Sequence, residues 1–388
     1  MLDLIFQRRI PTTVSIPPPC RLQFSRTLKT TLDNVLAKPQ DLVAWLRLLL
    51  LPVCILNLYM PKSSAKEKSG TRKKLQIAAI NQALVTWLEP NGCFTLVQKL
   101  LDLSMTNNQR KQSTKGKKKD ANLQACRKKL SYGHYIAALR VLSSNGVAPS
   151  TPDTLYELQQ KHSSAPPPVI PLDNISAAAL SVNSNSVLHA LKSFPKGTAC
   201  GRDGLRAQHL LDALSGAAAA VSDELLHSII TVVNLWLDGR CHTVLGEYVA
   251  SAPLTPLLKP GGGLRPIAVG TIWRRLCSKL AATSVCKDMT SYLGNYRFDV
   301  GIPCGSEGIL HSANKLVELK GGQDNMSMLL IDFTNALIWW IEPYWSMRSE
   351  LDALPYLDGS SFAMQNQLAF ITMTQSCHQQ KEYNKATL

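Results

Sequence analysis

One carboxylate, Asp332, stands at the end of an apolar run and could hold a metal ion or a polar substrate. The run Met326–Ile331 has the length and composition of a buried strand. A carboxylate at the mouth of such a strand is costly unless water, a partner group or a cation takes its charge. A strand-end acid is also typical of a cap or a surface group, and no second carboxylate cluster follows downstream.

Two cations, Lys259 and Arg265, flank a glycine-rich turn and could bind phosphate. The segments Ala252–Lys259 and Leu264–Gly270 predict two strands, and the Pro-Gly-Gly-Gly sequence between them predicts a β-hairpin. Cations held close to glycine backbone N–H groups would form a triphosphate clamp. The alternative is a surface hairpin with ordinary solvated charges. The turn is not a Walker A loop, because no Gly-Lys-Ser/Thr opens the next helix.

The elements around these residues predict an α+β fold. Prolines at 253, 256 and 266 cannot donate ladder hydrogen bonds, so the hairpin strands should lie at a sheet edge. Apolar periodicity predicts a helix capped by Ser222 and ending at Asp238-Gly239, a helix over Ile272–Ser284, and another over Ser306–Leu319. The inward residues expected on the last helix are Ile309, Leu310, Ala313, Leu316 and Val317.

The N-terminal region predicts further helices after an extended start at Pro17-Pro18-Pro19. Their expected ranges are Leu28–Ala37, Leu42–Leu51, Leu75–Trp87 and Phe94–Leu103. Leu42–Met60 is a candidate membrane span, but Arg47 and Pro52 interrupt it, which favours a packed helix. No membrane partner is therefore expected.

The basic excess lies in the N-terminal part and indicates contact with nucleic acid. The net charge is +15; residues 1–150 carry 24 Lys and Arg against 7 Asp and Glu, and the rest carry 18 against 20. Such an excess favours binding to a phosphate backbone, although a solvated basic surface is the alternative. The main basic run lies in Thr106–Lys129, with a helix expected from about Asn122. The candidate nucleic-acid-binding residues are Arg110, Lys111, Lys115, Lys117, Lys118, Lys119, Arg127, Lys128 and Lys129.

Ten cysteines give no sign of a zinc module or a disulfide framework. None forms a Cys-x-x-Cys pair, and the eight histidines show no ligand spacing beside them. Reduced thiols favour the cytoplasm or the nucleus. The N-terminus has Arg8-Arg9 but an acidic Asp3 and no cleavage site, so a secretory signal is not expected.

Four motifs occur in one order: Gly201–Arg206, then the hairpin with its Leu264–Val269 strand, then Trp273–Leu276, then Asp332–Ala336. In this order the chain resembles the reverse transcriptases of LINE-type (non-LTR) retrotransposons, closely over roughly Tyr132–Ala336. Each motif alone is common, and the combination is specific. The upstream part also resembles the region that precedes the polymerase in such elements.

The resemblance implies a helix-rich N-terminal region followed by the fingers and an incomplete palm of a right-hand polymerase. Lys259 and Arg265 would then contact the phosphates of the incoming nucleotide. Asp332 would be the first catalytic aspartate, and the backbone carbonyl of Phe333 would share its metal. Nucleotidyl transfer needs two Mg²⁺ ions to stabilise the attacking and leaving oxygens. The implied partners are an RNA or DNA template and primer.

Departures from the family pattern predict that this chain is inactive. Leu337 stands where the family has an aromatic residue that excludes the 2′-hydroxyl. The Gln-Gly-Asp-Pro segment and the second aspartate motif are missing after Ala336, so Mg²⁺ should not bind productively. One codon choice for Gln380–Leu388, read two bases later, encodes the missing family segment. We therefore hypothesise that the tail is a frameshifted relic of that segment.

The expected organisation has five segments. A helical region (1–104) precedes a basic linker (105–130) and a helical segment with a proline-rich linker (131–180). Polymerase-like fingers and a partial palm (181–340) follow, and the aberrant tail is last (341–388). The predicted function is a mobile-element-derived, RNA-directed DNA polymerase-like fragment without catalysis; a non-catalytic basic nucleic-acid-binding remnant is the alternative.

Overall fold

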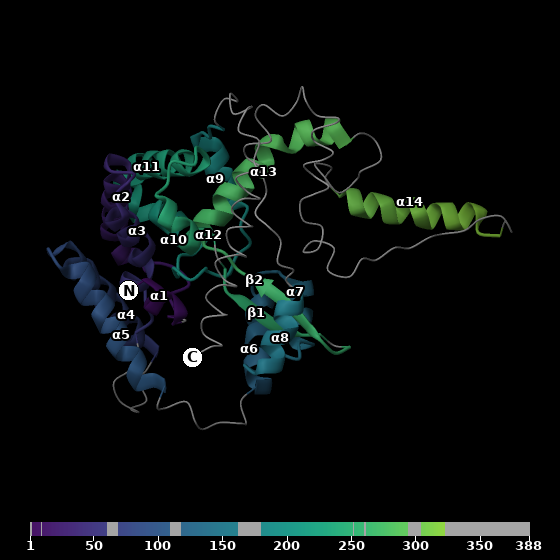
Figure 1. The fold of residues 1–388 in the computed structure, drawn as a ribbon, viewed down its shortest axis with the longest axis horizontal. Helices are drawn as coiled ribbons and strands as arrows, with labels where there is room; N and C mark the ends of the chain where they lie inside the picture. The colour runs from purple at the N-terminus through teal and green to yellow at the C-terminus, as the bar shows by residue number, and fades with distance from the viewer. Residues whose placement is uncertain are drawn as a thin grey trace.

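The chain folds into a helical body that carries one small β-hairpin (Figure 1). The computed structural model describes residues 2–8, 10–59, 69–108, 118–161, 180–250, 252–259, 261–293 and 304–322. The helices of the first half are α1 (Leu2–Gln7), α2 (Pro18–Ala37), α3 (Leu42–Ile55), α4 (Ser69–Leu88), α5 (Gly92–Asn108), α6 (Lys118–Leu130), α7 (Tyr135–Leu142) and α8 (Pro152–Gln160). The second half holds α9 (Ser184–Lys192), α10 (Ala207–Ala213), η2 (Gly216–Ala218), α11 (Ala219–Leu237), η3 (Thr243–Leu245), α12 (Gly246–Ala250), β1 (Leu254–Leu258), β2 (Leu264–Ala268), α13 (Ile272–Leu293) and α14 (Gly305–Lys320). Helices with an antiparallel strand pair agree with the α+β class.

Helix α2 begins at Pro18 rather than at Leu28. Pro17 is its N-cap, with φ −55° and ψ 137°, and Pro18 lies in the first turn. Proline fits this position because its missing N–H would have no partner inside the helix. The extended start predicted for the three prolines therefore ends at Pro17.

Helix α3 is packed inside the body, as its interruptions at Arg47 and Pro52 predicted. Leu48, Leu49, Leu50 and Leu51 are each at most 1% exposed, and the Arg47 guanidinium lies 5.4 Å from the Trp87 ring centre. Among the described helices, only α11 is long and apolar enough to cross a membrane, and 44% of its apolar window is buried. A helix with one face in a protein core meets the same criteria, so no membrane is indicated.

Helices α1–α5 share one hydrophobic core with helices α9–α13, and the hairpin contributes no residue to it. Helix α2 packs along α11. Trp45 of α3 stacks on Trp236 of α11 with ring centroids 5.7 Å apart, and Trp236 meets Trp273 of α13 edge-on at 6.2 Å. Such aromatic pairs add stability beyond their buried area. The segment boundaries predicted near residues 104 and 181 stay predictions from the sequence.

A buried carboxylate fastens α10 to the start of α2. Asp212 is 3% exposed. Its Oδ2 accepts a hydrogen bond from the Ile16 N–H at 2.8 Å, and its Oδ1 accepts one from Gln208 Nε2 at 3.0 Å. The Arg21 guanidinium also lies 3.0 Å from Oδ1. The buried charge is therefore compensated by three donors, as buried ions require.

A buried histidine makes the second link between α10 and the N-terminal segment. The Arg206 N–H donates to His209 Nδ1 at 3.2 Å, so Nε2 carries the ring proton and donates it to the Thr13 carbonyl at 2.7 Å. Burial lowers the pKa of His209 to about 4. The neutral imidazole thus serves as a fixed structural bridge.

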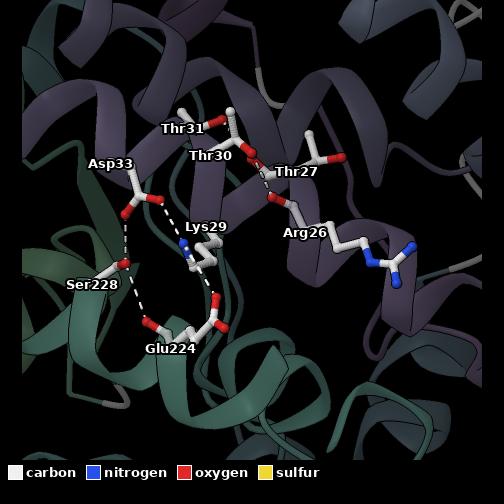
Figure 2. Close-up of polar contacts among 8 residues, drawn as sticks. All are labelled: Arg26, Thr27, Lys29, Thr30, Thr31, Asp33, Glu224 and Ser228. Atoms are coloured by element: carbon white, nitrogen blue, oxygen red, sulfur yellow. Dashed lines mark hydrogen bonds and ion pairs between the residues drawn. The ribbon is translucent and has the colours of Figure 1, made fainter. Parts of the chain in front are cut away.

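The exposed edge of the α2–α11 contact is closed by a polar network, which Figure 2 shows. Lys29 Nζ lies 2.8 Å from Asp33 Oδ2 and 3.5 Å from Glu224 Oε2. Ser228 Oγ donates to Asp33 Oδ1 at 2.6 Å. The network joins one turn of each helix across their shared rim.

Helix α11 begins at Ala219, so the predicted cap at Ser222 is wrong. Ser222 lies inside the helix, and its Oγ donates to the Leu214 carbonyl at 2.9 Å. The predicted end is confirmed, because Gly239 follows the helix with φ +67° and its N–H donates to the Trp236 carbonyl. Glycine is favoured there because the left-handed conformation needs no Cβ.

Other helices also differ from their predicted extents: α3 continues to Ile55, α4 spans Ser69–Leu88 and α5 spans Gly92–Asn108. Helix α6 starts at Lys118 rather than near Asn122, and α13 continues to Leu293 instead of ending near Ser284. Helix α14 lies where it was expected, but its predicted inward face is open: Ile309 is 47% exposed and Leu310 58%.

Candidate nucleic-acid interface

The predicted hairpin is present, and its turn depends on glycine. Strands β1 and β2 pair antiparallel with Leu258 opposite Leu264. The Lys259 N–H donates to the Gly263 carbonyl at 3.0 Å, and the Gly262 N–H donates to the Lys259 carbonyl at 3.2 Å. Gly262 and Gly263 have φ of +94° and +77°, a conformation that residues with a Cβ rarely adopt.

Both candidate phosphate-binding cations lie on one face of the hairpin. Arg265 is opposite Leu257, and Lys259 follows Leu257 by two positions. Side chains two residues apart in a strand share a face, so Lys259 and Arg265 point to the same side. Both residues are exposed. The arrangement therefore presents two solvated cations beside the glycine turn.

A salt-bridged pair on α8 and its C-cap covers the outer edge of β2. The Leu264 N–H donates to Glu157 Oε1 at 2.8 Å, and Lys161 Nζ donates to the Leu264 carbonyl at 2.6 Å. The hydrogen bond from Lys161 is the main cause that lowers the pKa of Glu157, and the Leu264 amide and the charge of Lys259 act in the same direction. The pair thus occupies the strand edge that would otherwise be open to another chain.

The segment from Asn145 to Ala148 covers the outer edge of β1. The Leu258 N–H donates to the Gly146 carbonyl at 3.0 Å, and the Ala148 N–H donates to the Pro256 carbonyl at 2.9 Å. These bonds form an antiparallel bridge between Val147 and Leu257. The sequence analysis did not predict this segment, because a stretch of only three residues before a proline is too short to show a strand pattern.

The predicted basic residues are only partly described. Arg127, Lys128 and Lys129 form the last turn of α6, and the first two are exposed. Lys118 and Lys119 begin the same helix. Arg110, Lys111, Lys115 and Lys117 lie outside the described residues.

The end of α6 is attached to the loop Phe194–Thr198. The Nε2–H of His134 donates to the Lys196 carbonyl at 3.1 Å. Gly197 has φ +77°, and a Cβ there would come within 2.7 Å of the Tyr132 ring. A close approach of backbone to an aromatic ring explains why glycine is needed at this point. The basic end of α6 and this loop therefore belong to one surface.

Two cations of α13 lie over the Phe194 ring of the same loop. Arg275 Cζ is 5.3 Å and Lys279 Nζ is 5.0 Å from the ring centre. Arg275 Nη1 also donates to the Ala199 carbonyl at 3.1 Å, and partial burial lowers its pKa. Cations interleaved with an aromatic ring are typical of surfaces that bind single-stranded nucleic acid. The sequence analysis used Arg275 only as part of the Trp273–Leu276 motif and did not pair it or Lys279 with Phe194, because residues so far apart in the sequence give no local signal.

A small cavity lies beside this loop. Its volume is about 180 Å³, which is below the roughly 300–1,000 Å³ of pockets that hold small-molecule ligands. Its lining is Val14, Ser15, Tyr132, Phe194, Pro195, Lys196, Gly197, Thr198, Arg206, Ala207, Gln208 and Leu211. The cavity is therefore smaller than a typical small-molecule site.

The Gly201–Arg206 motif is a buried turn that joins the N-terminal segment to α13. A Cβ on Gly201 would lie 2.5 Å from Thr271 Cα, and the Gly204 carbonyl accepts a hydrogen bond from Thr12 Oγ1 at 2.7 Å. Asp203 is fully buried; its Oδ1 accepts from the Leu205 N–H at 3.3 Å, and its Oδ2 has no hydrogen-bond partner. Burial raises the pKa of Asp203 to about 7. This motif positions α13 and does not present a binding loop.

The proposed catalytic residues are not among the described ones. Asp332, Phe333 and Leu337 all lie beyond residue 322, where the described part of the chain ends. Within the described ranges, no group of three or more His, Cys, Asp or Glu side chains could hold a metal ion. The absence of productive Mg²⁺ binding therefore stays a prediction from the sequence.

Comparison with known proteins gives no match to a family model, a curated protein or a solved structure. The function of this chain must therefore be inferred from its own residues and geometry.

Proposed function

We propose that the chain is a mobile-element-derived fragment that resembles an RNA-directed DNA polymerase of the non-LTR type and lacks catalysis. One observation supports this proposal: the hairpin is present, and Lys259 and Arg265 lie on one of its faces beside a glycine turn. Two cations and backbone N–H groups can bind the phosphates of a nucleotide.

Catalysis is not expected because Asp332 is the only palm carboxylate motif in the sequence. Two Mg²⁺ ions about 4 Å apart need carboxylates from more than one position. Leu337 would also be smaller than the aromatic residue that the family uses to exclude a 2′-hydroxyl. The chain would retain the nucleotide-gripping hairpin of a polymerase without its metal centre.

The hairpin's role can be tested by nucleotide binding. Titration of the full chain with a fluorescent deoxynucleoside triphosphate should show weak binding that Lys259→Ala and Arg265→Ala each reduce. Arg140→Ala is the matched control, because Arg140 is an exposed cation on the neighbouring α7. Equal effects of all three substitutions would show that Lys259 and Arg265 are ordinary solvated charges and that the hairpin has no specific role in nucleotide binding.

Catalysis can be tested on the same preparation by primer extension with Mg²⁺. We expect no extension on RNA or DNA templates. Extension that Asp332→Asn abolishes would contradict the inactive state and would require a second carboxylate elsewhere in the chain.

A second candidate is a basic nucleic-acid-binding remnant. It is favoured by the position of Arg275 and Lys279 over the Phe194 ring. Each phosphate contact lowers the logarithm of the affinity by about 0.7 per tenfold rise in salt for a single strand. We expect Lys279→Ala to weaken binding of a 20-nucleotide strand and to reduce this slope by about one contact. Arg140→Ala should leave the slope unchanged. Absence of binding at about 50 mM salt would remove this candidate, whereas binding that triphosphates do not compete for would favour it over the first.

A further inference from the structure

The small cavity of about 180 Å³ has a positively charged lining. Two of its lining residues, Lys196 and Arg206, are cations, and none of its lining residues is acidic. The carboxylate that the lining residue Gln208 contacts belongs to Asp212, which is already paired with Arg21 at 3.0 Å. The lining therefore carries a positive charge that an anion inside the cavity would balance.

The Arg206 guanidinium is held in place and still has free donors. Its Nη1 donates to the Thr198 carbonyl at 3.3 Å, and its buried Nε–H has no hydrogen-bond partner. Among the residues that the structure describes, no carboxylate forms an ion pair with it. A charge that is partly removed from water is costly unless a partner compensates it. An anion beside Arg206 would supply that partner.

The turn Pro195–Thr198 adds backbone donors to the same lining. The Thr198 N–H donates to the Pro195 carbonyl at 3.1 Å, and Gly197 has φ +77°, as at the third position of a type II turn. The N–H groups of the two central residues, Lys196 and Gly197, make no hydrogen bond with the described part of the chain. Adjacent free N–H groups in a turn form a concave site for an anion.

Contacts with the end of α6 keep this turn in one position. The Nε2–H of His134 donates to the Lys196 carbonyl at 3.1 Å, and the Tyr132 ring lies directly against Gly197. Donors that are fixed before a ligand arrives lose less conformational entropy when they bind it. The turn is therefore preorganised for a small anion.

The volume of the cavity selects a single phosphate group. At about 30 Å³ per water molecule, the cavity has room for about six waters, which is enough for one phosphorus atom with its oxygens. A nucleoside would stay outside, because pockets that enclose such ligands start at about 300 Å³. We propose that this cavity binds one phosphate group, supplied either by free phosphate or by the 5′ end of a nucleic-acid strand.

The positive charge continues from the cavity along the Phe194 ring. Phe194 lines the cavity, and Arg275 and Lys279 lie over its ring. A strand with its terminal phosphate in the cavity could place its next phosphates near these two cations. The site thus adds a binding position to the second candidate function, and it does not depend on that function, because free phosphate would bind in the same way.

A phosphorus NMR titration of the full chain with inorganic phosphate tests the site. In about 50 mM chloride we expect a dissociation constant of about 1 mM. Lys196→Glu should weaken binding at least about tenfold, because it replaces a cation of the lining by an acid. Lys192→Glu is the matched control, because Lys192 is an exposed lysine of the preceding helix that does not line the cavity. The control should change the affinity by less than about threefold, because salt screens its charge.

Arg206→Gln tests the buried cation in the same titration. It should also weaken binding at least about tenfold, because it removes a charged donor from the cavity. Circular dichroism would show whether this variant is folded. If it is not, the comparison of Lys196→Glu with Lys192→Glu decides the question, because both of these residues are exposed.

Two short oligonucleotides separate the sources of the phosphate group. Tighter binding of a strand with a 5′-phosphate than of the same strand with a 5′-hydroxyl, lost in Lys196→Glu, would assign the cavity to a strand end. Equal binding of the two strands, together with binding of inorganic phosphate, would assign it to free phosphate. The proposal is overturned if inorganic phosphate does not bind at about 20 mM and the two strands bind equally. It is also overturned if Lys196→Glu and Lys192→Glu weaken binding to the same extent. None of these results bears on the hairpin, which is tested with triphosphates and with substitutions of Lys259 and Arg265.

Discussion

Replacing Asp203 by asparagine should change how the stability of the protein depends on pH. Burial raises the pKa of this carboxyl from 3.8 to about 7. The folded state therefore holds the proton at pH values where the unfolded state has lost it. This contribution is fully present below pH 3.8 and is lost as the pH rises through about 7.

The size of the effect follows from the pKa change. At about 1.36 kcal/mol per pH unit, the full loss is about 4 kcal/mol, of which about 3 kcal/mol falls between pH 5 and pH 8.5. Asparagine cannot ionise, and its Oδ1 can still accept the Leu205 N–H. The free energy of unfolding of Asp203→Asn, relative to the wild type, should therefore rise by about 3 kcal/mol over this interval.

Urea unfolding followed by tryptophan fluorescence at pH 5, 7 and 8.5 would measure this difference. All other titrating groups act equally in the two proteins, so their contributions cancel. Asp223→Asn is the control, because Asp223 is an exposed acid on α11 and a surface substitution away from special features usually changes stability by no more than about 0.5 kcal/mol. A flat difference for Asp203→Asn would refute the assignment of a buried carboxyl with a raised pKa to this turn.

Three further substitutions test other parts of the argument. Gly201→Ala should destabilise the protein by about 3 kcal/mol in urea unfolding, because its Cβ would meet the Thr271 backbone at 2.5 Å. Gly133→Ala, at φ +78° in open space, should cost only about 1–2 kcal/mol, and equal costs would contradict the close approach at Thr271. For His209 the pKa is lowered to about 4, so its contribution is present above pH 6.5 and about 3 kcal/mol is lost as the pH falls to 4. His209→Gln should remove that acid sensitivity in the same titration. Ser228→Ala should cost about 1 kcal/mol by removing its hydrogen bond to a carboxylate; no measurable cost would show that the rim network does not hold α2 to α11.

Local sequence signals were sufficient where the structure is determined locally. The hairpin was predictable because glycines separate two short apolar runs, and the backbone needs positive φ at Gly262 and Gly263. The end of α11 was predictable for the same reason at Gly239. The burial of α3 followed from Arg47 and Pro52, which make a membrane span unfavourable.

Long-range contacts explain what the sequence did not predict. Ser222 has the side chain of an N-cap, yet its hydroxyl is used on Leu214, and the helix continues past it toward the N-terminus. The open face of α14 could not be foreseen, because periodicity indicates which side is apolar and not whether anything covers it. The contact of Phe194 with Lys279 joins residues 85 positions apart, and no local pattern predicts such a pair.

The position of the hairpin depends on residues that precede it by about a hundred positions. A two-stranded hairpin is marginal in water on its own. Here Glu157 and Lys161 bind the outer edge of β2 and Gly146 binds that of β1, so both edges are held by the region that follows the basic helix α6. That region is in turn attached through His134 to the loop that carries Phe194. If the hairpin binds phosphate, the same connections keep Lys259 and Arg265 in a fixed relation to the basic end of α6, because all of them belong to one packed unit.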